Sequence, residues 1–170
     1  VSSQSVRMAG DKMNTDITEY IKAKHGLVIG EHSAEQIKIK LGTALKVAEP
    51  KTMDVRGRDV ATGMPRQIQI NENEIEEALH DTLDQIVHAA IAVLETVPPE
   101  LASDIIDRGV MLTGGTALLH GIDQLFSEKL KVPVVVSQDP LDNVAKGAGE
   151  LLERMQANPA NNGKRKRKRK

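Results

Sequence analysis

The chain has 170 residues and a mass of 18.5 kDa, which predicts one domain or a compact pair of subdomains. It contains no cysteine, so a disulfide scaffold, a zinc ribbon, a cysteine nucleophile and a thiol redox site are excluded. Tyr20 and Phe126 are the only members of the Phe, Trp and Tyr class, which argues against the stacking surfaces that bind single-stranded nucleic acid. No apolar run approaches the roughly 20 residues of a membrane span, and no N-terminal segment resembles a signal peptide.

Charge is unevenly distributed along the chain. The sequence has 23 Lys and Arg against 24 Asp and Glu, for a formal net charge of −1. Seven basic residues form the run 164–170, and without them 16 basic residues face 24 acidic ones, a net charge of −8. An acidic body does not favour binding to DNA, so only the basic tail is a candidate for binding anions. A run of basic residues contacts phosphates and does not recognise a base sequence.

The first part of the chain predicts a strand and two helices. Residues 1–8 alternate loosely between polar and apolar side chains and indicate an edge strand. Apolar residues recur at helical spacing over 13–24, which predicts an amphipathic helix. We expect a second helix to begin at a capping box, in which the Ser33 hydroxyl accepts from a backbone amide and Gln36 reaches back. The apolar stripe of that helix comprises Ile37, Leu41 and Leu45.

A hairpin and the longest helix are expected in the middle of the chain. Residues 52–56 and 66–70 are typical of two strands with a glycine-rich connection. Asn71 then caps a helix whose apolar residues follow a three-four rhythm as far as Val97. The pair Pro98-Pro99 ends it, and a short helix follows.

Strands and helices alternate in the last third of the chain. An apolar strand over 109–113 runs into a glycine turn, and a helix follows the turn. The β-branched run 132–136 predicts a buried strand. Asp139 and Pro140 favour the start of a last helix, with the aspartate as its cap. From residue 157 onward the chain is polar and of low complexity, and we expect disorder.

Two features have both a chemical and an ordinary interpretation. Gly114 and Gly115 join a strand to a helix, where glycines let a ligand approach the backbone, but a tight turn explains the same pair. Glu35 and Lys38 share one helix face, where they could hold ribose hydroxyls or an adenine edge, but an exposed ion pair explains them too. On these residues alone the ordinary interpretation is favoured in both cases. The sequence has no GxxxxGK[ST] phosphate loop.

Several short motifs occur in a characteristic order, and together they carry a family resemblance. They are Ala9-Gly10-Asp11, Ser33-Ala34-Glu35-Gln36-Ile37-Lys38, Val55-Arg56-Gly57-Arg58, Pro98-Pro99-Glu100-Leu101-Ala102-Ser103-Asp104-Ile105, Arg108-Gly109, Leu112-Thr113-Gly114-Gly115, Asp139-Pro140-Leu141 and Val144-Ala145-Lys146-Gly147-Ala148-Gly149. The series resembles the C-terminal half of the MreB family of bacterial actin-like rod-shape proteins, collinearly over roughly residues 1–155. Hsp70-type proteins share only the Glu-x-x-Lys and Gly-Gly features and are more distant.

The resemblance implies an α/β, actin-like ATPase fold of the actin and Hsp70 type, in which two lobes surround a nucleotide cleft. The chain would form the second lobe, with an inserted α+β subdomain. Residues 1–12 and 77–144 would be the inner subdomain, and residues 13–76 the outer one. A helix over 145–156 would return to the first lobe, and 157–170 would be a disordered basic tail.

The resemblance also assigns a nucleotide site, with ATP as the cofactor and Mg²⁺ in the intact fold. No catalytic residue and no metal ligand is assigned to this chain. Because both phosphate loops of the family lie outside the sequence, we expect the chain alone not to hydrolyse ATP. The family usually has a third glycine after Gly114 and Gly115, and here that position is Thr116. Its side chain restricts the backbone conformations that the turn can adopt. The residues implied to line the adenosine pocket are Glu35 and Lys38 on one side and Gly114, Gly115, Thr116 and Ala117 on the other.

In this family the protein would polymerise with ATP into filaments under the cytoplasmic membrane and determine rod shape by guiding cell-wall synthesis. The implied partners are further copies, the first lobe or an intact homologue, and the wall-synthesis machinery at the inner membrane, with no specific nucleic acid. The implied location is the cytoplasm, with filaments associated with the membrane. Since the chain begins at Val1 in a strand-like stretch, we expect a fragment of a longer protein.

Two other classes of function stay open at this level. The chain could be a non-catalytic module that docks on filaments, caps them, or complements a separate first lobe. It could also bind nucleic acid or anionic lipid through the tail over 164–170.

Overall fold

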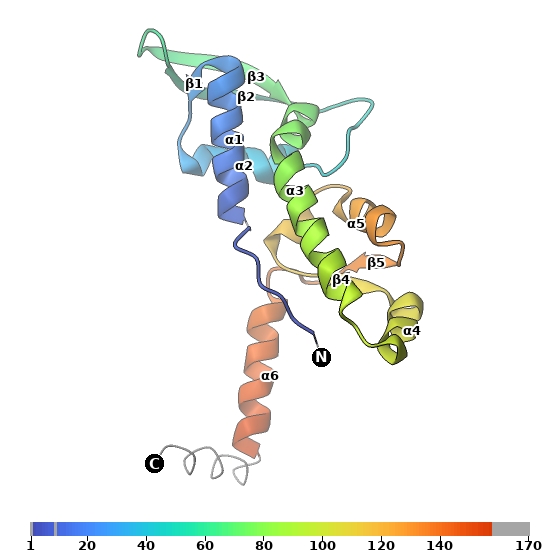
Figure 1. Cartoon of the computed structure of the whole chain (residues 1–170). Coiled ribbons are helices and arrows are strands. Elements are labelled where there is room, and N and C mark those ends of the chain that lie inside the picture. The colour runs from blue at the N-terminus through green and yellow to red at the C-terminus, as the bar shows by residue number, and fades with distance from the viewer. Residues whose placement is uncertain (1, 9, 158–170) are drawn as a thin grey trace, which may run out of the picture.

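The computed structural model describes residues 2–8 and 10–157, and it has a mixed α/β architecture in two parts joined by one long helix (Figure 1). Its elements are α1 (Gly10–His25), β1 (Leu27–Val28), α2 (Glu31–Leu41), β2 (Thr52–Asp59), β3 (Pro65–Asn71), α3 (Glu72–Glu95), α4 (Pro99–Arg108), β4 (Val110–Leu112), the 3₁₀ helix η1 (Gly115–Leu118), α5 (Ile122–Leu130), β5 (Val134–Val136) and α6 (Asn143–Ala157). We call α1, α2 and β1–β3 the upper part, and α4, α5, η1, β4 and β5 the lower part.

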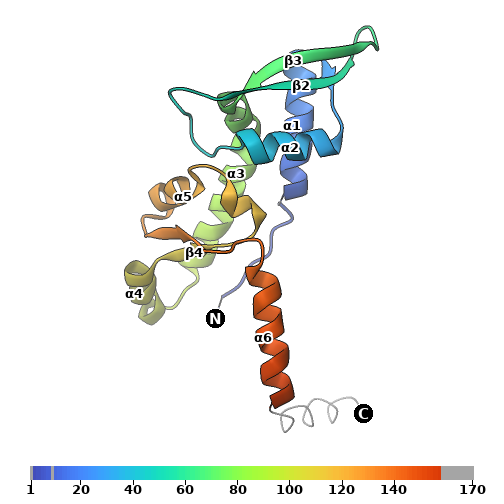
Figure 2. The same cartoon turned by 180° about the vertical axis from the view of Figure 1, so that it is seen from behind.

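The upper part is an antiparallel sheet in the order β1-β2-β3, packed on α1 and α2 (Figures 1 and 2). The hairpin expected over 52–56 and 66–70 is confirmed and is longer at both strands, with Thr52 opposite Asn71 and Arg58 opposite Pro65. Side chains alternate along β2, so Val55 is buried and its neighbours are exposed. The sheet, α1 and α2 share one core, whose buried residues include Met13, Ile17, Ile21, Leu27, Ile37, Val55 and Ile70.

The long helix α3 runs from the upper to the lower part (Figure 1). Its predicted cap is confirmed, because the Asn71 side chain accepts from the Glu74 amide and the Glu74 carboxylate accepts from the Asn71 amide. The helix ends at Glu95, before Val97. Its buried apolar stripe of Ile75, Leu79, Leu83 and Val87 extends the core of the upper part toward α5.

The lower part contains a parallel pair of strands, in which Val110 lies opposite Val134. Phe126 on α5 is buried against this pair. The strand expected over 132–136 is confirmed as β5, but it is buried on one face only: Val134 and Val136 pack against the core, whereas Val135 is 50% exposed. On the neighbouring strand Met111 is 67% exposed. A two-stranded sheet covered by α5 on one face leaves the side chains of its other face in solvent.

Two expectations for the first part of the chain are also wrong. Residues 2–8 form no strand, because no other strand pairs with them and an isolated strand has no partner for its backbone groups. The helix α2 begins at Glu31 after the extended Gly30, so Ser33 lies within its first turn and caps nothing. It ends at Leu41, so Leu45 is not part of its stripe.

The last helix begins later than expected. Asp139 and Pro140 do not start it, since residues 139–142 form a turn in which the Asp139 carbonyl accepts from the amide of Asn143. From this turn α6 projects away from the lower part (Figures 1 and 2), and its apolar residues Val144, Leu151 and Leu152 are at least 60% exposed. Val1, Ala9 of the first motif and the tail over 158–170 lie outside the described residues. Among the helices of the described chain, none combines the length and hydropathy needed to span a membrane.

Candidate functional site

The first wall of the candidate site is an ion pair on α2 that faces α1. The Lys38 ammonium donates to Oε2 of Glu35 at 2.7 Å and to the carbonyl of Gly10 at 3.1 Å. The side-chain amide of Asn14, on α1, donates to the same Glu35 oxygen at 2.7 Å. The Lys38 side chain is 13% exposed and that of Glu35 is 40% exposed. Two groups outside the pair, the Gly10 carbonyl and the Asn14 amide, hold it in place, so it differs from a pair of fully solvated side chains.

The same contacts determine the charge of the Glu35 carboxyl. The hydrogen bond from Lys38, followed by the one from Asn14, lowers the pKa of Glu35 below its ordinary value. Glu35 is therefore ionised at neutral pH and acts only as a hydrogen-bond acceptor. Oδ1 of Asn14 is buried and has no hydrogen-bond partner within the described residues, a rare state for a buried acceptor.

The second wall is the turn that follows β4. Gly114 has a φ of 89°, a left-handed conformation that glycine adopts without strain, and a Cβ at this position would have no atom within 4 Å. The amide of Gly114 and the hydroxyl of Thr113 both donate to the carbonyl of Pro140, at 2.9 and 3.2 Å. The sequence predicts one helix after the turn, but the structure has two, η1 and α5. Gly121, with a φ of 73°, lies between them and interrupts the helical backbone.

The structure brings the two walls together around one cavity of about 670 Å³. Five of the six residues assigned from the sequence line it: Glu35, Lys38, Gly114, Gly115 and Thr116. Ala117 is not in the lining, because it is only 5% exposed and belongs to the buried side of η1. The other lining residues are Gly10, Asp11, Ile39, Thr113, Leu118, Leu119 and Leu141.

Sequence reasoning missed two features of this site. Asn14 interrupts the apolar stripe of α1, and a buried polar residue in such a stripe is the signal that could have identified it. Ile39, Leu118 and Leu141 line the cavity with exposed apolar side chains, at 67%, 58% and 69% exposure. Their positions depend on the folded arrangement of three separate segments, so no local pattern predicts them.

The residues of the cavity fit the nucleoside end of a nucleotide. Its volume lies within the range of small-molecule sites, which combine mostly apolar walls with a few polar groups. Glu35 supplies an ionised acceptor for hydroxyls, and Gly114 exposes backbone without a side chain. Over residues 2–8 and 10–157 no group of three or more His, Asp and Glu side chains could hold a metal ion.

Comparisons with known proteins agree with the motifs. The family model described as MreB/Mbl protein matches residues 1–160. The cell shape-determining protein Mbl of Bacillus subtilis (strain 168) is 52% identical over 159 residues, which cover 94% of this chain and 48% of that protein. The cell shape-determining protein MreB of Escherichia coli (strain K12) is 48% identical over 153 residues, covering 90% of this chain and 44% of that protein.

A solved structure extends the agreement to the fold. The crystal structure of MreB5 of Spiroplasma citri bound to AMPPNP superposes with a TM-score of 0.87 at 31% identity, over 94% of this chain and 48% of that one. The expected actin-like fold is thereby confirmed. The chain spans about half the length of the curated relatives it matches. With a family model matched over residues 1–160, the chain belongs to the MreB/Mbl family of actin-like proteins.

Proposed function

We propose that the cavity between α2 and the turn after β4 binds the adenosine end of ATP or ADP. The observation that carries the proposal is the meeting of Glu35 and Lys38 with Gly114, Gly115 and Thr116 around one cavity, although the two groups are more than 70 residues apart. The nucleotide in the matched MreB5 structure supports the same ligand class for this chain.

Each residue would have a distinct part in binding. Glu35 would accept hydrogen bonds from ribose hydroxyls, while Lys38 and Asn14 hold its carboxylate in place. Gly114 would let the nucleotide approach the backbone, because a Cβ there would lie in the open cavity. Ile39, Leu118 and Leu141 would contact the faces of the base. Mg²⁺, when bound with the nucleotide, neutralises phosphate charge.

At the level of the whole protein, we propose an ATP-dependent filament that determines cell shape by organising wall synthesis at the cytoplasmic side of the membrane. The names of the curated relatives, both cell shape-determining proteins, support this function. Within it, residues 1–12 and 77–144 would form the inner subdomain and 13–76 the outer subdomain of one lobe. The helix expected over 145–156 would contact the other lobe.

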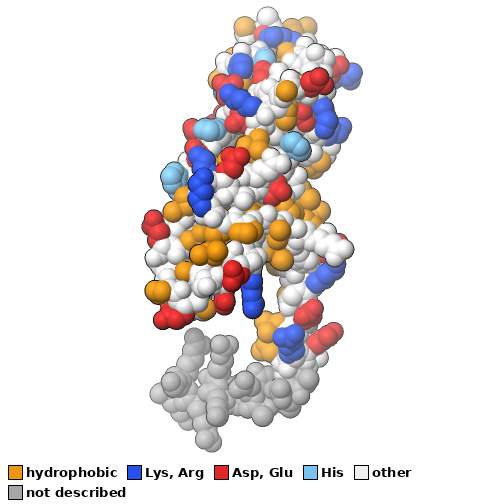
Figure 3. Space-filling model, turned by 90° about the vertical axis from the view of Figure 1, so that its right-hand side faces the viewer, with side chains coloured by type: hydrophobic (Ala, Val, Ile, Leu, Met, Phe, Trp, Pro, Cys, Tyr) orange, Lys and Arg blue, Asp and Glu red, His pale blue; other side chains and the backbone are white. Residues whose placement is uncertain are grey.

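The surface of the lower part supports self-association or contact with another lobe. Hydrophobic side chains gather there in the space-filling view (Figure 3). Ile106 on α4 and Met111 on β4 are 64% and 67% exposed. Exposed apolar side chains that lie close together mark surfaces that bind other proteins, so burial of this surface would favour assembly.

Calorimetric titration of the 170-residue chain with ADP and with adenosine tests the site. The variants Glu35→Gln and Lys38→Met are expected to lower the affinity for both ligands about tenfold, which is the effect of losing one hydrogen bond to a charged group. Glu31→Gln, on the exposed first turn of the same helix, is the matched control and should leave the affinity unchanged. Equal affinities of all three variants and the unchanged chain would exclude this cavity as the site.

A further inference from the structure

The central strand of the upper sheet has one open edge. On one side β2 pairs with β3 from Thr52 to Arg58. On the other side it pairs with β1 only at Arg58 and Asp59, because β1 consists of two residues and ends at Val28. Over residues 52–57 no other strand of the described part of the chain pairs with this side of β2, so it presents an open edge.

Hydrogen bonds at the two ends of the hairpin identify which residues face this edge. The amide of Asp59 donates to the carbonyl of Met64, and the amide of Glu72 donates to the carbonyl of Lys51. Odd-numbered residues of β2 thus direct their backbone groups toward β3. In an antiparallel ladder the alternate residues face the opposite neighbour, so Asp54 and Arg56 direct their N–H and C=O groups to the open edge.

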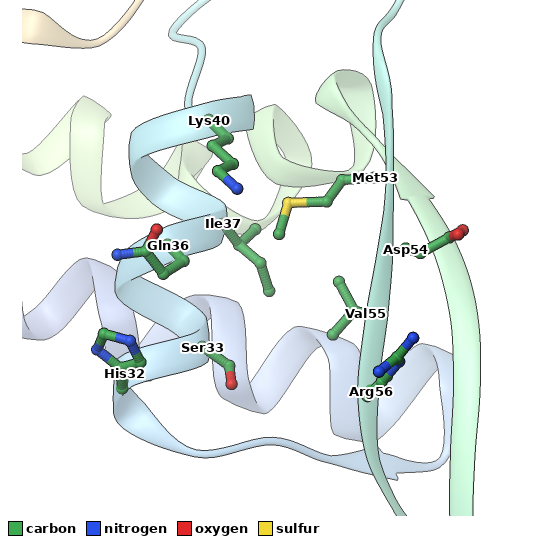
Figure 4. Close-up of a pocket in the computed structure, with 9 residues that line it drawn as sticks. All are labelled: His32, Ser33, Gln36, Ile37, Lys40, Met53, Asp54, Val55 and Arg56. Atoms are coloured by element: carbon green, nitrogen blue, oxygen red, sulfur yellow. The ribbon is translucent and has the colours of Figure 1, made fainter.

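A groove of about 330 Å³ lies along this edge, between β2 and α2 (Figure 4). Ile37, Met53 and Val55 form its apolar floor, with the side chains of Ile37 and Val55 buried. The Asp54 side chain points away from α2, and the Arg56 guanidinium donates to Gln67 on β3 at 2.9 Å. Since both side chains turn away, Asp54 and Arg56 line the groove mainly with their backbones.

The groove carries a positive charge on its α2 side. The Lys40 side chain extends toward β2 in the close-up view (Figure 4). Lys40 takes part in no ion pair within the described chain, whereas Lys38 on the other face of the helix is paired with Glu35. A carboxylate is the group that complements this charge.

We propose that this edge binds an extended peptide segment of a partner protein, which adds a strand beside β2 in line with β1. The backbone of the peptide would pair with Asp54 and Arg56, as in strand addition to exposed sheet edges. Alternate side chains of the peptide would point into the groove, where an apolar one contacts Ile37 and an acidic one pairs with Lys40. The groove and the nucleotide cavity share no lining residue, so the two sites can be tested separately.

The probe is a fluorescein-labelled peptide of the sequence Thr-Val-Thr-Glu-Thr-Val-Thr-Glu, in which the apolar and acidic side chains are two residues apart and so share one face of the strand. It is titrated with the 170-residue chain and followed by fluorescence anisotropy. Saturable binding is expected. Asp54→Pro removes one N–H at the open edge without removing a bond to β3, and should weaken binding about tenfold. Asp54→Ala keeps that N–H and is the matched control, with unchanged affinity.

The charge is tested in the same assay. Lys40→Glu should weaken binding about tenfold. Its matched control is Lys22→Glu on the exposed face of α1, which should change the affinity less than about twofold. A peptide with lysine in place of every glutamate should bind the unchanged chain at least about tenfold more weakly, and equal binding of the two peptides would overturn the proposal.

A measurement on the unchanged chain keeps the test independent of how well any variant folds. A peptide methylated on alternate backbone nitrogens cannot donate along one edge, and it should bind about tenfold more weakly than the parent peptide. Equal binding of the methylated peptide, or no binding of the parent peptide, would overturn the proposal. Sedimentation that reveals a dimer abolished by Asp54→Pro, with no peptide binding, would assign the edge to a second copy instead.

Discussion

Thr43 lies beside His120 in a parallel bridge that joins the segment after α2 to the segment after η1. The amide of Ala44 donates to the carbonyl of His120 at 2.8 Å, and the amide of His120 donates to the carbonyl of Gly42 at 3.2 Å. Thr43 is fully buried. Because this bridge follows directly on α2 and on η1, it determines how far apart the two walls of the cavity lie.

The first prediction concerns the glycine next to this bridge. A Cβ on Gly42 would lie 2.2 Å from the Lys38 carbonyl oxygen and 2.5 Å from Cδ2 of Leu119. Gly42→Ala should therefore lower the free energy of unfolding by about 1–3 kcal/mol and also weaken ADP binding. Urea denaturation and calorimetry check both effects. Gly30→Ala is the control, since a Cβ there meets no atom within 4 Å; a similar loss in both variants would contradict the steric explanation.

A second prediction follows from the two donors that bind Glu35. Lys38 makes the larger contribution to its lowered pKa and Asn14 the smaller one. Lys38→Met should raise the pKa of Glu35 more than Asn14→Ala does, and both should raise it toward the ordinary value of a glutamate. Carboxyl ¹³C chemical shifts measured against pH give the values. The opposite order, or no change, would mean that these contacts do not persist in solution.

Asp59 provides a third prediction, on the pH dependence of stability. Its carboxylate accepts from Arg66 and from the amides of Ala61 and Thr62, which lowers its pKa from 3.8 to about 2. A carboxyl group whose pKa is lower in the folded than in the unfolded chain stabilises the folded state at pH values above its unfolded pKa. For Asp59 this stabilisation is lost as the pH falls from 3.8 through about 2.

The melting temperatures of the unchanged chain and Asp59→Ala should therefore differ at pH 7 and converge as the pH approaches 2. Scanning calorimetry at several pH values measures the difference. Asp81→Ala, on the exposed face of α3, is the control and should alter the melting temperature little at any pH. A difference between the Asp59 variant and the unchanged chain that persists undiminished at pH 2 would refute the assignment.

The fourth prediction contrasts a true helix cap with an expected one. Asn71 caps α3 through a capping box, so Asn71→Ala should lower the free energy of unfolding by about 1 kcal/mol. Ser33 was expected to cap α2 but lies inside its first turn, so Ser33→Ala should be neutral or slightly stabilising. Urea denaturation of the two variants measures both, and an equal loss of stability would restore the expected role of Ser33.

These two caps illustrate how far the sequence predicts the fold. The cap at Asn71 was predictable because its partner Glu74 is three residues away and the apolar rhythm of α3 follows at once. The cap predicted at Ser33 does not form, because the helix α2 begins two residues earlier, at Glu31, directly after the extended Gly30. The Asp139-Pro140 start failed for a tertiary reason: the Pro140 carbonyl accepts bonds from Thr113 and Gly114, which holds the segment in a turn.

The candidate site was predictable to a similar extent. Glu35, Lys38, Gly114 and Gly115 belong to local motifs whose order along the chain indicated a common pocket. Asn14 belongs to no motif, and its role depends on α1 packing against α2. Contacts of this kind arise from tertiary packing, which the spacing of residues along one helix does not encode.

The helix α3 has a mechanical consequence for the molecule. Its 24 residues extend about 36 Å and contact α1 and α2 in the upper part and α5 in the lower part. A helix of this length resists stretching, so a rotation of the upper part about α3 and the Thr43–His120 bridge would change the distance between α2 and the turn after β4, the two walls of the candidate cavity. The tip of the β2–β3 hairpin lies far from α3 (Figure 1), so such a rotation would displace the tip more than it displaces the cavity walls.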